Sequence, residues 1–129
     1  LLAAKDGSCV AAIHAGWRGL AAGVIEETVK AMPVAPSQLA AVIGPCIGAA
    51  VYRVGDEVIQ QLRAANAQPV FVYQHLNLAA TARAQLEPSG LKAQVSMSDI
   101  CTFTHHRMFY CHRRNEQKGR FGAFVQCPL

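Results

Sequence analysis

The order of apolar and polar positions along the chain predicts strands that alternate with helices. Residues 1–14 contain two short apolar runs separated by an Asp-Gly dipeptide, which is typical of a β-hairpin. Beyond it, apolar side chains recur at helical spacing over 20–32, and two prolines follow. The apolar run at 39–44 lies between proline-containing turns and predicts a buried strand.

The second half of the chain continues this alternation. In order, the pattern predicts a helix that begins near Val54, a strand at 69–74, a helix at 78–86, and strands at 91–100 and 119–126. Asn77 stands where the N-cap of the helix at 78–86 belongs. Alternating strands and helices with a hairpin predict an α/β fold with a mixed sheet, in a single domain over 1–129.

The bulk composition is that of a globular domain. The chain has 129 residues, 52% of them hydrophobic and 16% charged, which is enough apolar material for one core. No apolar stretch reaches the ~18 residues of a membrane span, so we expect no membrane association. The chain starts without Met, as though inside a strand, and we expect it to be part of a longer protein.

The cysteines and the charge add two expectations about surroundings and partners. Five scattered cysteines are an odd number without a disulfide framework, which favours a reducing compartment and hence the cytoplasm. The formal charge is +4, and basic side chains crowd 107–120. That stretch favours an anionic ligand or is simply a solvated face. No nucleic-acid-binding pattern accompanies it, so we expect no nucleic-acid partner.

The segment "HAGWRG", from His14 to Gly19, is the strongest candidate site. It follows a predicted strand and precedes a predicted helix, where ligands tend to collect in α/β folds. His14 can act as a base or a metal ligand, and Arg18 can bind phosphate or carboxylate. Gly16 and Gly19 would let the backbone approach a ligand. The structural alternative is a corner packed around Trp17.

Two cysteine-containing regions offer further chemistry. Cys46 in "GPCIG" would be the nucleophile of a thiol hydrolase if His14 acted with it, although a buried structural cysteine fits the sequence better. A second group suggests zinc by residue type, but its spacing matches no known framework. Its members are Cys101, His105, His106, Cys111 and His112.

Four blocks of the chain together resemble the laccase-domain, or YfiH-like, family. They are "IHAGWRGLAAGVIEETV", "IGPCIG" followed by "YRVGDEV", "LNLAATARAQLEPSGL" and "DICTFTHHRMFYCHRRNEQKGRFGAFV". The resemblance implies a four-layer α/β/β/α sandwich of the YfiH or necrotizing-toxin type, with its N-terminal portion missing here. It also implies a metal-capable site of two histidines and one cysteine. His14 matches one histidine, and the other two ligands would precede Leu1.

The resemblance extends to other site residues. Arg18 matches the arginine of the "HAGWRG" block, and Arg113 and Arg114 match the arginines of a "FSYRRD" block. Cys111 and His112 depart from its Ser and Tyr. We therefore expect His14 to be catalytic and a metal ligand, and Gly16, Arg18, Gly19 and Arg113 to bind substrate or phosphate.

The activity implied by the resemblance is phosphorolysis of purine nucleosides such as adenosine and inosine, with adenosine deamination as a related reaction. Its partners would be a purine nucleoside and phosphate, and its metal zinc, with copper as the alternative. Three other functions stay open: a copper-dependent polyphenol oxidase, a Cys/His hydrolase, and an inert fragment. The oligomeric state is left open.

Overall fold

The fold is mixed α/β, as the sequence predicts. The computed structural model describes residues 1–91, 94–114 and 118–128. The helices are α1 (Trp17–Ala21), α2 (Val24–Ala31), α3 (Asp56–Ala64) and α4 (Leu78–Leu86), with short helical turns η1 (Pro36–Gln38), η2 (Ala49–Val51) and η3 (Glu87–Leu91). The strands are β1 (Leu2–Ala4), β2 (Val10–Ala11), β3 (Leu39–Ile43), β4 (Phe71–Val72), β5 (His75–Leu76) and β6 (Val95–Met97).

The main sheet has the strand order β2-β1-β3-β6. The hairpin of β1 and β2 is antiparallel, and β1 also pairs antiparallel with β3. The last pair, β3 and β6, is parallel, with Ala41 opposite Val95 and Ile43 opposite Met97. A second, two-stranded sheet joins β4 and β5. Parallel strands end at the same edge of a sheet, so the residues that follow Ile43 and those that follow Met97 start from neighbouring positions.

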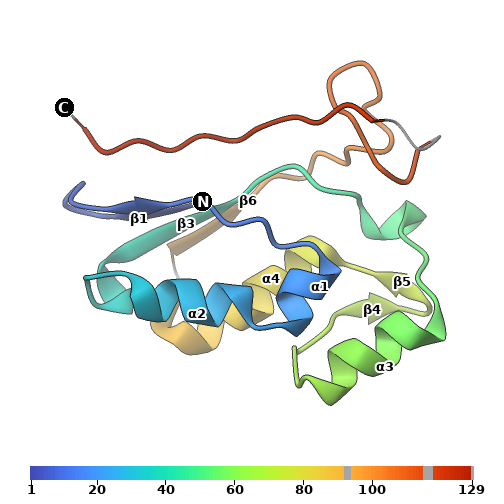
Figure 1. Cartoon of the computed structure of the whole chain (residues 1–129), viewed down its shortest axis with the longest axis horizontal. Helices are drawn as coiled ribbons and strands as arrows, with labels where there is room; N and C mark the ends of the chain where they lie inside the picture. The colour runs from blue at the N-terminus through green and yellow to red at the C-terminus, as the bar shows by residue number, and fades with distance from the viewer. Residues whose placement is uncertain (92–93, 115–117, 129) are drawn as a thin grey trace.

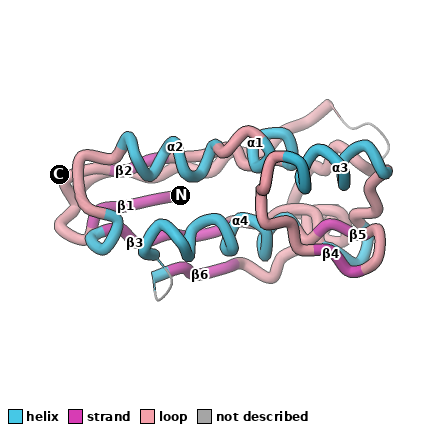
Figure 2. The backbone as a smooth tube through the Cα atoms, turned by 90° about the horizontal axis from the view of Figure 1, so that it is seen from below, coloured by secondary structure: helices cyan, strands magenta, loops and turns pink. Residues whose placement is uncertain are grey.

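One face of the main sheet is buried under helices. In β3, Leu39 and Ala41 are buried, whereas Ala40 and Val42 on the other face are exposed. Figure 1 shows α2 and α4 on one side of the sheet and the C-terminal segment on the opposite side. Figure 2 shows α3 with β4 and β5 grouped at one end of the molecule, away from the hairpin. No helix in the described ranges is long and apolar enough to cross a membrane.

The predicted helix at 20–32 is interrupted in the structure. It consists of α1 and α2, and Gly23 between them has a φ of 74°, in the left-handed region. A left-handed residue ends one helix and redirects the chain into the next, and glycine adopts it without a steric penalty. Helical periodicity continues across the break, which is why the pattern alone predicted one helix.

Helix α4 begins as the sequence predicts. The Asn77 side chain accepts a hydrogen bond from the Ala80 N–H at 2.9 Å, which confirms the N-cap. One turn later, the Thr81 hydroxyl donates to the Asn77 carbonyl at 2.8 Å and accepts from the Val70 N–H at 2.9 Å. Thr81 is fully buried, so it ties the start of α4 to the segment that enters β4.

Three predicted strands are shorter than expected or absent. Within the predicted 69–74 only 71–72 is a strand, and among the described residues of the predicted 91–100 only 95–97 is one. The prediction at 119–126 is wrong, since these residues form no strand and Phe124 is 92% exposed. An apolar run becomes a strand only where another strand offers backbone partners, and the described part of the chain provides none here.

Candidate functional site

The "HAGWRG" segment joins β2 to α1 on the surface of the molecule. His14 and Arg18 are both exposed, whereas Trp17 packs against the core. The Arg18 guanidinium lies 4.5 Å from the centroid of the Trp17 ring, which places the cation over an aromatic face. Trp17 therefore packs against the core, as the structural alternative expects, and also positions Arg18. The side chains of His14 and Arg18 remain exposed to solvent.

The two glycines of this segment contribute differently. Gly16 has φ −68° and ψ 172°, a conformation that any residue adopts. At Gly19, a Cβ would lie 3.2 Å from the His14 carbonyl oxygen and 3.2 Å from a methyl group of Val24. A side chain there would push against the backbone of His14. Gly19 therefore allows the turn to fold tightly around the His14 backbone, whereas a Cβ at Gly16 would make only an ordinary contact, 3.4 Å from Nε2 of the His14 ring.

The helix that follows the segment differs from the prediction. At such a position a helix N-terminus can offer free N–H groups and a dipole to an anion, but α1 has only five residues. The macrodipole grows with aligned peptide units, and one turn supplies little of it. The charged side chain of Arg18 is therefore a stronger candidate for anion binding at this site than the helix dipole.

Arg18 and Arg113, which are far apart in the sequence, both act on the phenol of Tyr52. Burial raises the pKa of Tyr52, and the positive charges of Arg113 and Arg18 partly offset that rise. The Arg113 guanidinium lies 5.0 Å from the centroid of the Tyr52 ring. Arg113 contacts the ring, whereas Arg18 acts on the phenol through its charge, and we call the region of these two cations the Arg18–Arg113 site.

The neighbouring arginines of "HRRN" have different environments. Arg113 is exposed and donates from Nη1 to the Arg53 carbonyl at 2.8 Å. Arg114 is partly buried, and its guanidinium donates to the carbonyls of Thr102, Phe103 and Phe109 at 2.9, 2.6 and 2.6 Å. Arg114 therefore holds the preceding loop together, while Arg113 faces solvent at the Arg18–Arg113 site.

Tyr52 was not identified as a site residue from the sequence. It lies directly after η2, is 8% exposed, and forms the floor beneath Arg113. Its only signal was a place in the "YRVGDEV" block of the family resemblance. Nothing in the spacing connects it to Arg113, because the contact depends on how the C-terminal loop folds back.

Cys46 lies beside Cys101 in the structure. The two residues form an isolated parallel β-bridge beyond the ends of β3 and β6, and the Thr102 N–H donates to the Cys46 carbonyl at 2.9 Å. Burial raises the pKa of the Cys46 thiol, and the nearby Cys101 adds to the rise against a hydrogen bond from the Ala79 N–H. A hydrolase nucleophile needs a thiolate, and this environment disfavours one at Cys46.

The remaining histidines and cysteines do not assemble a metal site in the described residues. No group of three or more His, Cys, Asp or Glu side chains there is arranged to hold an ion. His105 Nδ1 is 2.9 Å from the Cys101 carbonyl and His106 Nδ1 is 3.3 Å from the Thr104 carbonyl, so both rings have local partners. Zinc needs about four ligands, and His14 supplies one, so the described residues do not complete the implied site.

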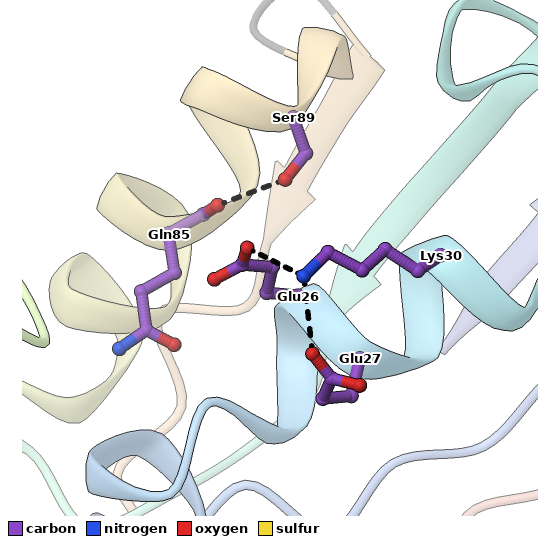
Figure 3. Close-up of polar contacts among 5 residues, drawn as sticks. All are labelled: Glu26, Glu27, Lys30, Gln85 and Ser89. Carbon is purple, nitrogen blue, oxygen red and sulfur yellow. Dashed lines mark hydrogen bonds and ion pairs between the residues drawn. The ribbon is translucent and has the colours of Figure 1, made fainter.

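A separate cavity of about 240 Å³ lies between the α1–α2 corner and the end of α4. Figure 3 shows three of its polar lining residues, Glu26, Gln85 and Ser89: Ser89 donates to the Gln85 carbonyl at 3.4 Å, and Glu26 pairs with Lys30 of the same helix at 2.9 Å. None of the residues predicted to bind substrate lines it. The charged residue that lines it, Glu26, is an acid, so the Arg18–Arg113 site is the better candidate for an anionic ligand.

Comparison with protein families matches residues 1–128 to the family described as multi-copper polyphenol oxidoreductase laccase. Among individual relatives, the chain is 37% identical over 127 residues to purine nucleoside phosphorylase YfiH of Escherichia coli (strain K12), covering 94% of this chain and 52% of that protein. It is 39% identical over 129 residues to a purine nucleoside phosphorylase of Pseudomonas aeruginosa, covering 94% and 53%. The chain thus spans about half the length of the relatives it matches.

The chain also matches solved structures over about half of their length. The chain is similar to the hypothetical protein YfiH of Bacillus licheniformis, with a TM-score of 0.76 and 29% identity over 88% of this chain and 47% of the other. It is also similar to protein NMB0706 of Neisseria meningitidis, with a TM-score of 0.75 and 32% identity over 89% and 50% of the two chains.

Proposed function

We propose a phosphorolytic function from one premise: this chain belongs to the family described as multi-copper polyphenol oxidoreductase laccase. Several relatives with this sequence similarity are named purine nucleoside phosphorylase. The proposed reaction of the whole protein is cleavage of the N-glycosidic bond of a purine nucleoside by phosphate. Adenosine and inosine are the proposed nucleosides, and the products are a purine base and ribose 1-phosphate.

The observation that carries the proposal is that the charges of Arg18 and Arg113 both act on the phenol of Tyr52, with the Arg113 guanidinium 5.0 Å from its ring. Phosphate must be held as an anion next to the anomeric carbon of ribose, and guanidinium groups bind it through paired N–H donors. Arg18 and Arg113 are both exposed, so both can reach a bound anion. Their charges would also stabilise the transition state, in which negative charge shifts between phosphate and base.

His14 has the second role in the proposed reaction. As the bond to the base breaks, electrons move into the purine ring, and a proton donor near that ring assists departure. His14 is exposed on the segment that also carries Arg18, and the proposal has His14 act on the base while Arg18 holds the phosphate. The tight turn at Gly19 sets the backbone at His14, and Gly16 lies between the two side chains along the chain. In adenosine deamination, His14 would instead activate water.

A metal enters this proposal only through His14. Zinc, or copper as the alternative, would take the imidazole as one ligand, and the described residues supply no set of further ligands for it. A bound zinc ion would lower the pKa of a coordinated water. Since the described residues do not complete such a site, the roles of Arg18, Arg113 and His14 are assigned without it.

The family description favours one second candidate, a copper-dependent oxidase of phenols. The test is product analysis with the whole protein. We expect inosine and phosphate to give hypoxanthine and ribose 1-phosphate, with no product bearing phosphate when phosphate is omitted. Free ribose as the sole sugar product, or no cleavage, would contradict phosphorolysis. Oxygen consumption with a phenol and stoichiometric copper would support the second candidate instead.

A further inference from the structure

The ends of β3 and β6 bring together two free cysteines, neither of which has a role in the proposed phosphorolysis. Beyond Ile43 and Met97 the two chain segments stay hydrogen-bonded: the Ser98 N–H donates to the Ile43 carbonyl at 2.8 Å and the Thr102 N–H to the Cys46 carbonyl at 2.9 Å. Cys46 and Cys101 are partners in the bridge at the end of this stretch. Neither residue is in a disulfide, and both are partly exposed.

The spacing of these partners suits a disulfide. Neighbouring strands lie about 4.8 Å apart, and residues joined by a disulfide have Cα atoms about 4.4 to 6.8 Å apart. Bridge partners also direct their side chains to the same side of the sheet. The backbone therefore needs no rearrangement of the strands for the two sulfur atoms to bond.

The surroundings of the two sulfur atoms are unequal. The Gly48 N–H donates to Cys101 Sγ at 3.2 Å. Burial acts to raise the pKa of Cys101, but this hydrogen bond and others from 103–104 outweigh it, so the pKa lies below its ordinary value. Cys46 has the opposite shift, mainly through burial. Cys101 is thus the more nucleophilic sulfur, and Cys46 is a protonated thiol beside it.

We propose that Cys101 and Cys46 form a peroxide-reactive dithiol site, in which Cys101 is oxidised first and Cys46 then closes a reversible disulfide. The Cys101 thiolate attacks one oxygen of hydrogen peroxide, the O–O bond breaks, and hydroxide leaves, giving a sulfenic acid. The Cys46 sulfur then attacks the Cys101 sulfur, the S–O bond breaks, and the departing hydroxide takes the Cys46 proton as water. Two thiols are oxidised and one peroxide is reduced to water.

The bridge has a consequence for reversibility. A disulfide here links two segments that already pair through their backbones, and both cysteines are partly exposed, so a reductant has access to the bond. A thiol reductant should therefore restore both cysteines. This behaviour distinguishes a dithiol site from oxidative damage, which proceeds to sulfinic and sulfonic acids.

The test uses the whole protein, treated with hydrogen peroxide, alkylated, digested and mapped by mass spectrometry without reduction. We expect a Cys46–Cys101 cross-linked peptide as the main product, and its loss after dithiothreitol. In Cys46→Ser the sulfenic acid should persist at Cys101 and be trapped by a 1,3-diketone reagent. In Cys101→Ser, oxidation at this site should slow at least tenfold.

Cys127→Ser is the matched control, because Cys127 is also free and partly exposed but belongs to the C-terminal segment. It should leave the Cys46–Cys101 product unchanged. Wild-type protein unfolded in urea should lose the selectivity for this pair. The proposal is overturned if folded wild-type protein cross-links Cys9 or Cys127 as readily, or if Cys101 stays a thiol while other cysteines oxidise. Mapping of the wild-type protein decides this even if a variant fails to fold.

Discussion

The guanidinium of Arg113 is held by two contacts, the ring of Tyr52 at 5.0 Å and the carbonyl of Arg53 at 2.8 Å. These contacts leave N–H donors of the guanidinium for a ligand, and the side chain stays exposed. An arginine fixed in this way loses less side-chain entropy when it binds an anion than a fully mobile one. Arg113 thus loses little side-chain entropy when it binds an anionic ligand.

Replacing Arg113 should weaken phosphate binding. A charge-assisted hydrogen bond contributes about 1.5 to 3 kcal/mol, so Arg113→Ala should raise the KM for phosphate about 10- to 100-fold. Steady-state kinetics with phosphate varied at saturating inosine would measure this. Arg63→Ala is the control, since the Arg63 guanidinium lies 6.0 Å from the Phe71 ring in a similar contact on α3. An equal change in both variants would contradict a specific role for Arg113.

Arg114 should affect stability rather than phosphate. Its three hydrogen bonds to backbone carbonyls would be lost in Arg114→Ala, which should lower the free energy of unfolding by about 2 to 4 kcal/mol. Arg114→Lys keeps the charge but cannot reach three carbonyls, so it should recover only part of that loss. Urea titration gives both values. If Arg114→Ala left stability unchanged and raised the KM for phosphate, Arg114 would have the phosphate-binding role that is assigned here to Arg113.

Two alanine substitutions separate the backbone at His14 from helix stability. In Gly19→Ala the new Cβ would press on the His14 carbonyl, and the shift should lower kcat/KM by about tenfold. In Gly23→Ala nothing lies within 4 Å of the new Cβ, but the left-handed φ costs about 1 kcal/mol. That variant should lose stability and keep kcat/KM. Equal kcat/KM in both variants would remove the steric argument for Gly19.

The buried hydroxyl of Thr81 should be more costly to remove than its methyl group. Thr81→Val leaves the Val70 N–H without its acceptor and should destabilise the fold by about 1 to 3 kcal/mol, whereas Thr81→Ser keeps the acceptor. Thr28→Val is the control, because the Thr28 hydroxyl donates to a helix carbonyl of its own segment. The urea midpoint of Thr81→Val should be lower than that of Thr28→Val. The reverse order would contradict the role of Thr81.

Tyr52 should make stability fall at alkaline pH. Its pKa is raised in the folded protein, so between the unfolded and folded pKa values the folded state retains a proton that the unfolded state has lost. Stability from this source is complete below about pH 10 and is lost as the pH rises above it. Tyr52→Phe should therefore show a shallower loss of unfolding free energy between about pH 9 and 11. A wild-type slope no steeper than that of the variant would exclude this effect.

The features that the sequence predicted best are those encoded by neighbouring residues. The cap at Asn77 and the hairpin before His14 depend on a few adjacent positions, and both are present. The contact of Arg113 with Tyr52 depends on packing across the fold, so no local pattern revealed it. The bridge of Cys46 and Cys101 was hidden for another reason. Both strands were expected, but their register is set by burial and crossover geometry rather than by composition.

The parallel pairing of β3 with β6 also determines the order in which the chain can fold. The hairpin of β1 and β2 closes a few residues and can form in microseconds. Pairing Ala41 with Val95 must close a loop of about 50 residues, through α3, β4, β5 and α4, before any of its hydrogen bonds form. The outermost strand β6 is therefore added late, and until then β3 presents an open edge on which another chain could pair.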